Sequence, residues 1–155
     1  MKKLVLKTTL CTVIAVLVLI GISILVLTIF SPKTLALFNH KLGNKGLSVY
    51  YSELQYNKTE DLDDLETLLY IINDANDYKK NVQYSKTMLE SDGFEDFAKI
   101  VDGGSGEYEF YVVSKYAVAL YYEGVEKAEI FTIVEGYLDN PTQIETIQLV
   151  INNLQ

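Results

Sequence analysis

The stretch "YYEGVEKAEIFTIVEGYLDNP", residues 121–141, indicates how this chain folds. It begins with the end of one helix and turns at Gly124, a residue type that ends helices. The apolar residues that follow recur three or four positions apart: Ala128, Phe131, Val134 and Leu138. This spacing places them on one face of a second helix. Asn140 and Pro141 then provide an N-cap and a first helical residue, so a third helix begins there.

The same spacing recurs along residues 46–155, where six apolar stripes and one further helical segment alternate with turn signals. We expect helices to start near residues 46, 61, 77, 92, 107, 125 and 141. Two segments, "YEFYVV" (108–113) and "EIFTIV" (129–134), are rich enough in β-branched and aromatic residues to form strands. Short hairpin turns such as Asn-Gly are absent, which argues against a sheet. The predicted fold is therefore all-α, with about six to seven helices after the N-terminal segment.

The N-terminal segment predicts a transmembrane helix over residues 8–30, which contain no charged side chain. The 21 residues from Leu10 to Phe30 would span about 31 Å as a helix, close to the thickness of a bilayer's hydrocarbon core. The run is longer than the apolar core of a signal peptide, so an uncleaved signal anchor is expected. A cleaved signal peptide, with its exit at Thr34-Leu35-Ala36, is the alternative.

Lysines on both sides of this segment bear on its orientation. Lys2, Lys3 and Lys7 favour a cytoplasmic N-terminus, and the lysines at 33, 41 and 45 weaken that bias. We expect a cytoplasmic basic tail (1–7), a transmembrane helix (8–30), a juxtamembrane linker (31–45) and an extracytoplasmic acidic domain (46–155). The bilayer is thus the first expected partner, through residues 8–30.

Charge separates the chain into two unlike parts. All 21 acidic residues and ten of the 13 lysines follow residue 30, so residues 31–155 carry about −11 and the first 30 about +3. There is no arginine, the residue type that reads phosphate and guanine in a bidentate manner. An acidic domain without arginine is not expected to bind nucleic acid or anionic lipid headgroups. A basic or membrane-bound protein partner is expected instead.

Cysteine and histidine are too few for most catalytic or metal sites. Cys11 is the only cysteine and lies in the apolar segment, so no intrachain disulfide can form. His40 is the only imidazole, and it follows the membrane segment closely. Metal sites with several Cys or His ligands and Ser-His-Asp triads are therefore not expected. We predict no cofactor and no metal.

Two segments resemble tetratricopeptide helical hairpins. "YAVALYYEGVEKAEIF" (116–131) combines small and aromatic residues, a glycine at the turn, and Glu-Lys-Ala before an aromatic residue. "NDYKKNVQYSKTML" (76–89) resembles the second helix of such a unit. The resemblance implies a right-handed stack of helix pairs over residues 46–155, with a concave face that binds peptides or proteins. The two segments lie three helices apart, so a strictly alternating array could not use both as second helices.

The chain is accordingly interpreted as a membrane-anchored protein-interaction module with an acidic, tyrosine-rich surface, and not as an enzyme. All 12 tyrosines follow the membrane segment, and tyrosine is enriched at binding hot spots. The expected partner-binding residues are Tyr84, Tyr116, Tyr121 and Tyr122. One alternative is a hydrolase that uses two carboxylates from Glu107, Glu109, Glu123 and Glu126. Another is a structural spacer or part of a longer repeat array.

Overall fold

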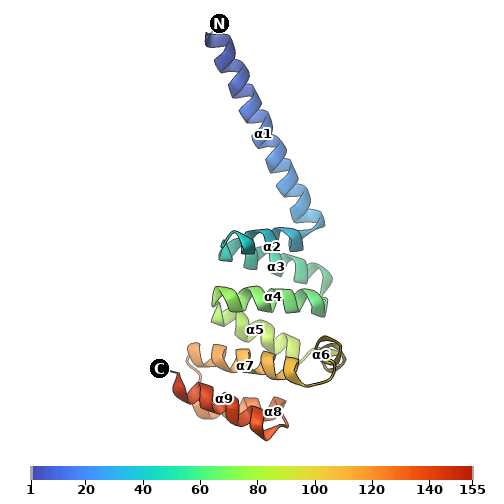
Figure 1. Cartoon of the computed structure of the whole chain (residues 1–155), viewed down its shortest axis with the longest axis vertical. Coiled ribbons are helices and arrows are strands. Elements are labelled where there is room, and N and C mark those ends of the chain that lie inside the picture. The colour runs from blue at the N-terminus through green and yellow to red at the C-terminus, as the bar shows by residue number, and fades with distance from the viewer. Residues whose placement is uncertain (1, 155) are drawn as a thin grey trace. The chain divides into compact units, whose positions relative to one another are not determined.

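The structure, a computed structural model, describes residues 2–154 and the side chains of residues 9–154. Within this part, every regular element is a helix, and nine helices follow one another without a strand (Figure 1). Their bounds are α1 Lys2–Phe30, α2 Pro32–Lys41, α3 Lys45–Thr59, α4 Leu62–Ala75, α5 Tyr78–Leu89, α6 Phe94–Asp102, α7 Glu107–Tyr122, α8 Lys127–Tyr137 and α9 Pro141–Asn153. The chain divides into two compact units, residues 1–55 and 56–155, and α3 crosses the boundary between them. The all-α prediction is confirmed for the described residues.

Helix α1 carries an apolar surface that is exposed along most of its described length. Its residues Thr9–Phe30 are long and apolar enough to cross a membrane, and none of them is buried. Two of its hydroxyl groups bond within the helix: Ser23 Oγ donates to the Leu19 carbonyl and Thr28 Oγ1 to the Ile24 carbonyl, each at 2.9 Å. Because a backbone carbonyl one turn earlier satisfies each of these hydroxyls, Ser23 and Thr28 are compatible with apolar surroundings.

Residues 31–45, expected as a linker, contain the helix α2. Ser31 breaks the preceding helix, because its φ of −149° and ψ of 64° are not helical, and Pro32 then occupies the first turn of α2. The helix ends at Lys41, and Gly43, at φ 73°, turns the chain toward α3. Only three residues therefore separate α2 from α3. The ten residues of α2 are too few to show a clear apolar repeat, so the sequence does not indicate this helix.

The expected helix starts agree with the observed ones within two residues. Side chains cap several of these starts: the carboxylate of Asp61 accepts from the Asp63 amide at 3.0 Å, that of Asp77 from Lys80, and the amide oxygens of Asn44 and Asn140 from Leu47 and Thr142. Each cap satisfies a backbone donor that the helix cannot satisfy itself. Both strand-like segments are helical in α7 and α8. Burial of their β-branched residues in the core decides this conformation over intrinsic strand propensity.

The second unit, residues 56–155, is held together by α7. This helix packs on α5, α6, α8 and α9, while α4 packs on α5 and α8 on α9. One apolar core lies among them, with buried members in α7, α8, α9 and the connection that precedes α9: Val113, Tyr116, Ala117, Leu120, Ile130, Val134, Leu138, Ile147 and Ile151. Helix α6 is exceptional because α7 is its principal contact, and it projects from the side of the other helices (Figure 1).

Candidate functional site

An open cleft of about 760 Å³ lies beside α7 in the second unit. Its lining comes from the α5–α6 connection, the start of α6, the loop before α7, the first turn of α7 and the connection between α8 and α9. We call it the acidic cleft, because four of its lining residues are carboxylates. Its residues are Leu89, Ser91, Asp92, Gly93, Phe94, Glu95, Ser105, Gly106, Glu109, Tyr137, Leu138, Asp139, Asn140 and Gln143. Three separate stretches of the chain, 89–95, 105–109 and 137–143, therefore form one concave surface.

Local interactions fix the walls of the acidic cleft. On the α6 side, Tyr108 is buried against the rings of Phe94 and Phe97, with centroids 6.2 and 5.8 Å away. The Asp102 carboxylate accepts hydrogen bonds from the amides of Gly104 at 2.8 Å and Tyr108 at 2.9 Å, and this bonding lowers the pKa of Asp102. The glycine-rich loop between α6 and α7 is thus tied down at both ends.

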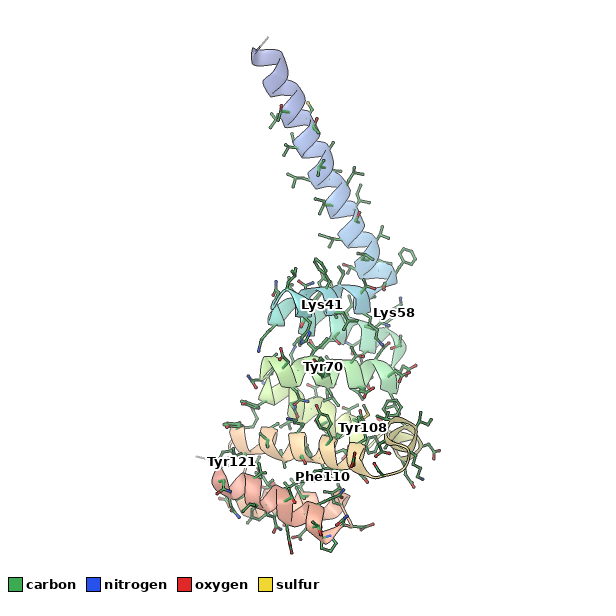
Figure 2. The ribbon with its side chains drawn as sticks, in the orientation of Figure 1. Lys41, Lys58, Tyr70, Tyr108, Phe110 and Tyr121 are labelled. Atoms are coloured by element: carbon green, nitrogen blue, oxygen red, sulfur yellow. The ribbon has the colours of Figure 1, made fainter. Side chains whose placement is uncertain are left out.

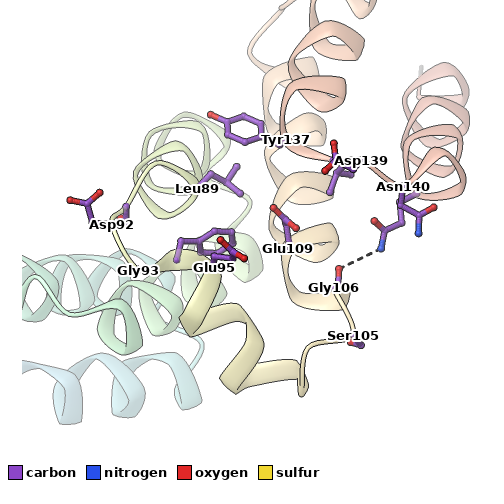
Figure 3. A pocket seen from close by; sticks show the side chains of 14 residues that line it. Leu89, Asp92, Gly93, Glu95, Ser105, Gly106, Glu109, Tyr137, Asp139 and Asn140 are labelled. Atoms are coloured by element: carbon purple, nitrogen blue, oxygen red, sulfur yellow. Dashed lines mark hydrogen bonds between the residues drawn. The ribbon is translucent and has the colours of Figure 1, made fainter.

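The opposite wall is fixed by the residues on either side of Asp139. Leu138 is buried in the core, and Asn140 caps α9 through the amide of Thr142. Asp139 lies exposed between these two anchors. Gln143, one turn into α9, donates to the Gly106 carbonyl at 3.4 Å and links this wall to the loop before α7 (Figure 3).

Three carboxylates converge in the acidic cleft. Figure 3 shows Glu95 from α6, Glu109 from α7 and Asp139 from the α8–α9 connection around one space, while Asp92 lies at another edge. Partial burial raises the pKa of Glu109 above its ordinary value, and the negative charges of Asp139, Glu95 and Asp102 raise it further. None of the described residues that line the cleft is a lysine. The cleft therefore concentrates negative charge at Glu109 and Asp139.

Glu95 differs from the other two carboxylates because a lysine outside the cleft neutralises it. Lys99 Nζ lies 2.6 Å from Glu95 Oε1, one turn along α6. The hydrogen bond and the charge of Lys99 lower the pKa of Glu95. Glu109 and Asp139 thus present the stronger attraction for a cation that enters the cleft.

A second cavity, of about 240 Å³, has a different character. We call it the tyrosine groove; it is lined by Glu66, Leu69, Tyr70, Asn73, Ser85, Tyr108, Tyr111, Val112 and Lys115. Tyr70 and Tyr108 are labelled in Figure 2. Lys115 Nζ already lies 5.7 Å from the centroid of the Tyr111 ring, so a cation of the chain itself occupies that aromatic face. The groove is therefore less suited than the acidic cleft to an incoming cation.

The four expected partner-binding tyrosines line neither cavity. Tyr84 and Tyr116 are buried, and Tyr121 is partly buried with its hydroxyl donating to the Leu154 carbonyl at 3.1 Å. Tyr122 is 47% exposed and stacks on Tyr78, with centroids 4.3 Å apart. The structure does not bring the four to one surface.

Among the four carboxylates considered for a hydrolase, only Glu109 lines the acidic cleft. Glu107 is the first residue of α7, while Glu123 and Glu126 flank the turn between α7 and α8. The partners of Glu109 in the cleft, Glu95 and Asp139, were not among the expected residues. They come from distant segments, and only the packing of α6, α7 and α8 brings them together.

No group of three or more His, Cys, Asp or Glu side chains in the described part of the chain is arranged to hold a metal ion. Cys11 is exposed on α1, outside the second unit. The chain matches no protein-family model, no curated protein and no solved structure. The acidic cleft can attract a cation, and its own Glu109 provides a carboxyl group of raised pKa.

Proposed function

We propose that the second unit is a protein-binding module whose acidic cleft receives a lysine- or arginine-rich segment of a partner. The observation that carries this proposal is Glu109, whose pKa is raised by burial and by Asp139 in a cavity without a lysine. An incoming ammonium or guanidinium group relieves this repulsion, because an opposite charge favours the ionised carboxylate. Without a partner, the negative charges of Glu109 and Asp139 repel each other in the cleft, and a cationic partner would compensate them.

The size and the walls of the acidic cleft also support this proposal. A volume of about 760 Å³ lies within the range of roughly 300–1,000 Å³ that is typical of ligand sites. Tyr137 and Phe94 contribute aromatic surface, and a cation gains further attraction where it meets an aromatic face. The cleft can therefore accept the stem of a long basic side chain as well as its charge.

The helical hairpins are proposed to form a tetratricopeptide-like stack with one insertion. If α6 is set aside, α4 and α5 form one pair and α7 and α8 the next, and the contacts of α5 with α7 join the pairs. The two segments that resemble second helices, 76–89 and the part of 116–131 within α8, then fall at equivalent positions. Helix α6 becomes the insertion that forms one wall of the acidic cleft.

The apolar helix α1 is proposed to be an uncleaved anchor with the second unit on the extracytoplasmic side. Its exposed apolar residues Thr9–Phe30 support the anchor. The lysines near the N-terminus favour this orientation. Confinement at a bilayer raises the effective concentration of the cleft for membrane-bound partners.

A hydrolase is a second candidate, because Glu109 has the raised pKa that a general acid needs. In this account Glu109 would donate a proton and Asp139 would act as the second carboxylate. A panel of nitrophenyl esters, phosphates and glycosides tests it. Hydrolysis by the wild type that is lost in Glu109→Gln would favour the enzyme, and no hydrolysis of any of them would count against it.

Site-specific photo-crosslinking in membranes of the source organism tests the binding module. A photoreactive amino acid replaces Gln143, which lines the acidic cleft, or Gln83, which is exposed on α5 outside both cavities. We expect the probe at 143 to crosslink a protein through a segment rich in Lys or Arg, and the probe at 83 not to do so.

The control is a charge reversal in the cleft. Glu109→Lys combined with Asp139→Lys should abolish the crosslink from position 143 if the cleft attracts the partner by charge. Reversal of Glu129 and Glu145, both exposed and outside the cleft, should leave it unchanged. Equal crosslinking at 143 and 83, or a crosslink at 143 that survives the cleft reversal, would contradict the proposal.

A further inference from the structure

Helix α2 has two opposite faces, and only one of them is covered. Pro32, Leu35 and Ala36 are buried on one side. The other side carries Leu37 and Phe38 together with Thr34 and Lys41, which lie on the same face because they are three or four positions apart. Phe38 is 58% exposed, and Leu42, directly after the helix, is 67% exposed. A short helix thus presents large apolar side chains away from the residues that bury its other face.

The formally charged residues in α2 and next to it in the sequence are all lysines. Lys33, Lys41 and Lys45 lie in or beside α2, and the first carboxylate of the chain is Glu53. The 21 acidic residues therefore begin only after the first turns of α3. A segment that combines exposed apolar side chains with lysines, inside an otherwise acidic protein, fits a surface that is apolar and negatively charged.

Helix α2 also follows the apolar helix α1 directly. Ser31 is the only residue between them, and its non-helical backbone redirects the chain so that α2 runs across the end of α1 (Figure 1). Phe30, the last residue of α1, is exposed like the rest of the apolar segment. If α1 crosses a bilayer, α2 is held at the level of the lipid headgroups by a connection of one residue.

We propose that α2 is an interfacial helix that lies on an anionic bilayer. Leu37, Phe38 and Leu42 enter the boundary between headgroups and acyl chains, as the apolar faces of interfacial helices do. Lys41 extends its ammonium group toward lipid phosphates while its aliphatic stem stays in the boundary. This inference rests on the membrane-spanning role proposed for α1.

The membrane explains the exposed face better than a protein occupant. The face follows the exposed apolar helix α1 after a connection of one residue, and its lysines complement anionic headgroups, each worth about a five-fold gain in affinity. The second unit, with its excess of carboxylates, would be repelled from the same surface. Helix α2 would thereby fix how deeply α1 is inserted into the bilayer.

Tryptophan fluorescence tests this proposal, because the chain has no native tryptophan. The full chain carrying Phe38→Trp is reconstituted into nanodiscs of phosphatidylcholine with phosphatidylglycerol, with or without bromine on the upper acyl carbons. Two other single-tryptophan variants serve as references: Ile20→Trp in α1 and Tyr70→Trp in the second unit, where Tyr70 is exposed. We expect brominated lipid to quench Phe38→Trp and Ile20→Trp and to leave Tyr70→Trp unchanged.

The three tryptophan positions separate the possible failures. An unquenched Phe38→Trp beside a quenched Ile20→Trp would overturn the interfacial helix and leave the anchor in place. If Ile20→Trp is also unquenched, the anchor itself fails, and the proposal for α2 fails with it. Blue-shifted emission of Phe38→Trp without quenching would show a protein contact, such as a second copy of the chain, and would overturn the proposal too.

Lipid composition tests the role of the lysines. Replacement of Lys33, Lys41 and Lys45 by Gln should reduce the quenching of Phe38→Trp in nanodiscs that contain phosphatidylglycerol. In nanodiscs of phosphatidylcholine alone, the same replacement should change it little. Equal quenching of the two variants in both lipids would overturn the specificity for anionic lipid.

Discussion

Apolar residues of the same kinds occupy opposite environments in α1 and in the second unit. Leu19 in α1 is 63% exposed, whereas Ile130 in α8 is 0% exposed. In α1 the apolar residues form an unbroken run around the whole helix, and in α8 they recur on one face. The comparison indicates that the pattern, and not the composition, decides whether an apolar side chain stays exposed or is buried in the protein core.

Charge follows the same division of the chain. Residues 1–52 contain six lysines and no carboxylate, a net charge of +6, while residues 53–155 contain seven lysines and 21 carboxylates, a net charge of −14; together these give −8. Negative charge is therefore kept away from the segment proposed to meet the membrane. It collects on the helices that form the acidic cleft.

The largest expected effect comes from charge in the apolar run of α1. Fifteen Leu, Ile, Val and Phe residues between positions 10 and 30 each favour insertion by roughly 0.3–0.6 kcal/mol, and each central lysine costs about 2.5–3.5 kcal/mol. Leu17→Lys with Ile20→Lys should therefore move the protein from the membrane to the soluble fraction after alkaline extraction. Leu17→Val with Ile20→Val should stay in the membrane fraction. Release of both variants from the membrane, or of neither, would contradict the role proposed for the apolar run of α1.

The equivalent change in the second unit should affect folding and leave membrane association unchanged. Ile130→Ala removes a buried side chain from the core cluster and should lower the free energy of unfolding by about 2–5 kcal/mol. Leu149→Ala, at a position that is 64% exposed on α9, should change it by less than about 0.5 kcal/mol. Urea denaturation of the full chain in detergent micelles measures both, and similar losses would contradict the assignment of the core.

A smaller effect is expected at the start of α9. Asn140→Ala removes the side-chain oxygen that accepts from the Thr142 amide, and loss of such a cap costs about 1 kcal/mol. Asn153→Ala, at the exposed end of the same helix, provides the matched control. Equal urea midpoints for the two variants would show that the cap contributes nothing.

Much of the fold could be predicted from the sequence, because its signals are local. Asp77 and Asn140 each cap a helix whose start was expected at or beside that position. Helix α2 was missed, since a ten-residue helix after Pro32 leaves no long repeat to detect. The place of α6 beside the other helices was also not foreseen, because it depends on the packing of Tyr108 against Phe94 and Phe97.

The candidate site could be predicted only in part. Glu109 was among the carboxylates considered, but Glu95 and Asp139 are 14 residues before it and 30 after it, respectively. No spacing along the chain indicates that these residues meet. Among the tyrosines expected to bind a partner, Tyr84 and Tyr116 are buried whereas Tyr122 is exposed, and helical spacing does not indicate this difference.

The smallest expected effect is the pH dependence of Glu109. Its raised pKa means that the folded protein disfavours the charged carboxylate, so Glu109→Gln should stabilise the protein at neutral pH. Because the group is partly solvated, the gain should stay below about 1 kcal/mol. It should be absent below the ordinary pKa of glutamate, about 4.3, and should grow as the pH rises through the raised value. Urea midpoints of the wild type and of Glu109→Gln, compared from about pH 4.3 to neutral pH, measure this gain in stability. A gain that appears only at low pH would contradict a raised pKa for Glu109.

The most direct test of the account is whether the acidic cleft itself binds a cationic peptide. An oligolysine peptide is titrated into the full chain in phosphatidylcholine nanodiscs, and binding is followed by calorimetry. The cleft variant carries Glu109→Gln and Asp139→Asn; the control carries Glu129→Gln and Glu145→Gln, which removes the same number of charges from exposed positions outside the cleft.

We expect the cleft variant to bind at least about tenfold more weakly than the wild type, because a charged hydrogen bond is worth about 1.5–3 kcal/mol and the loss of one alone is a factor of about ten or more. The control should bind within about twofold, since exposed charge pairs contribute at most about 1 kcal/mol and often much less. Equal weakening of the two variants would show that net charge, and not the cleft, attracts the peptide. That result, or no binding by the wild type, would contradict the central claim.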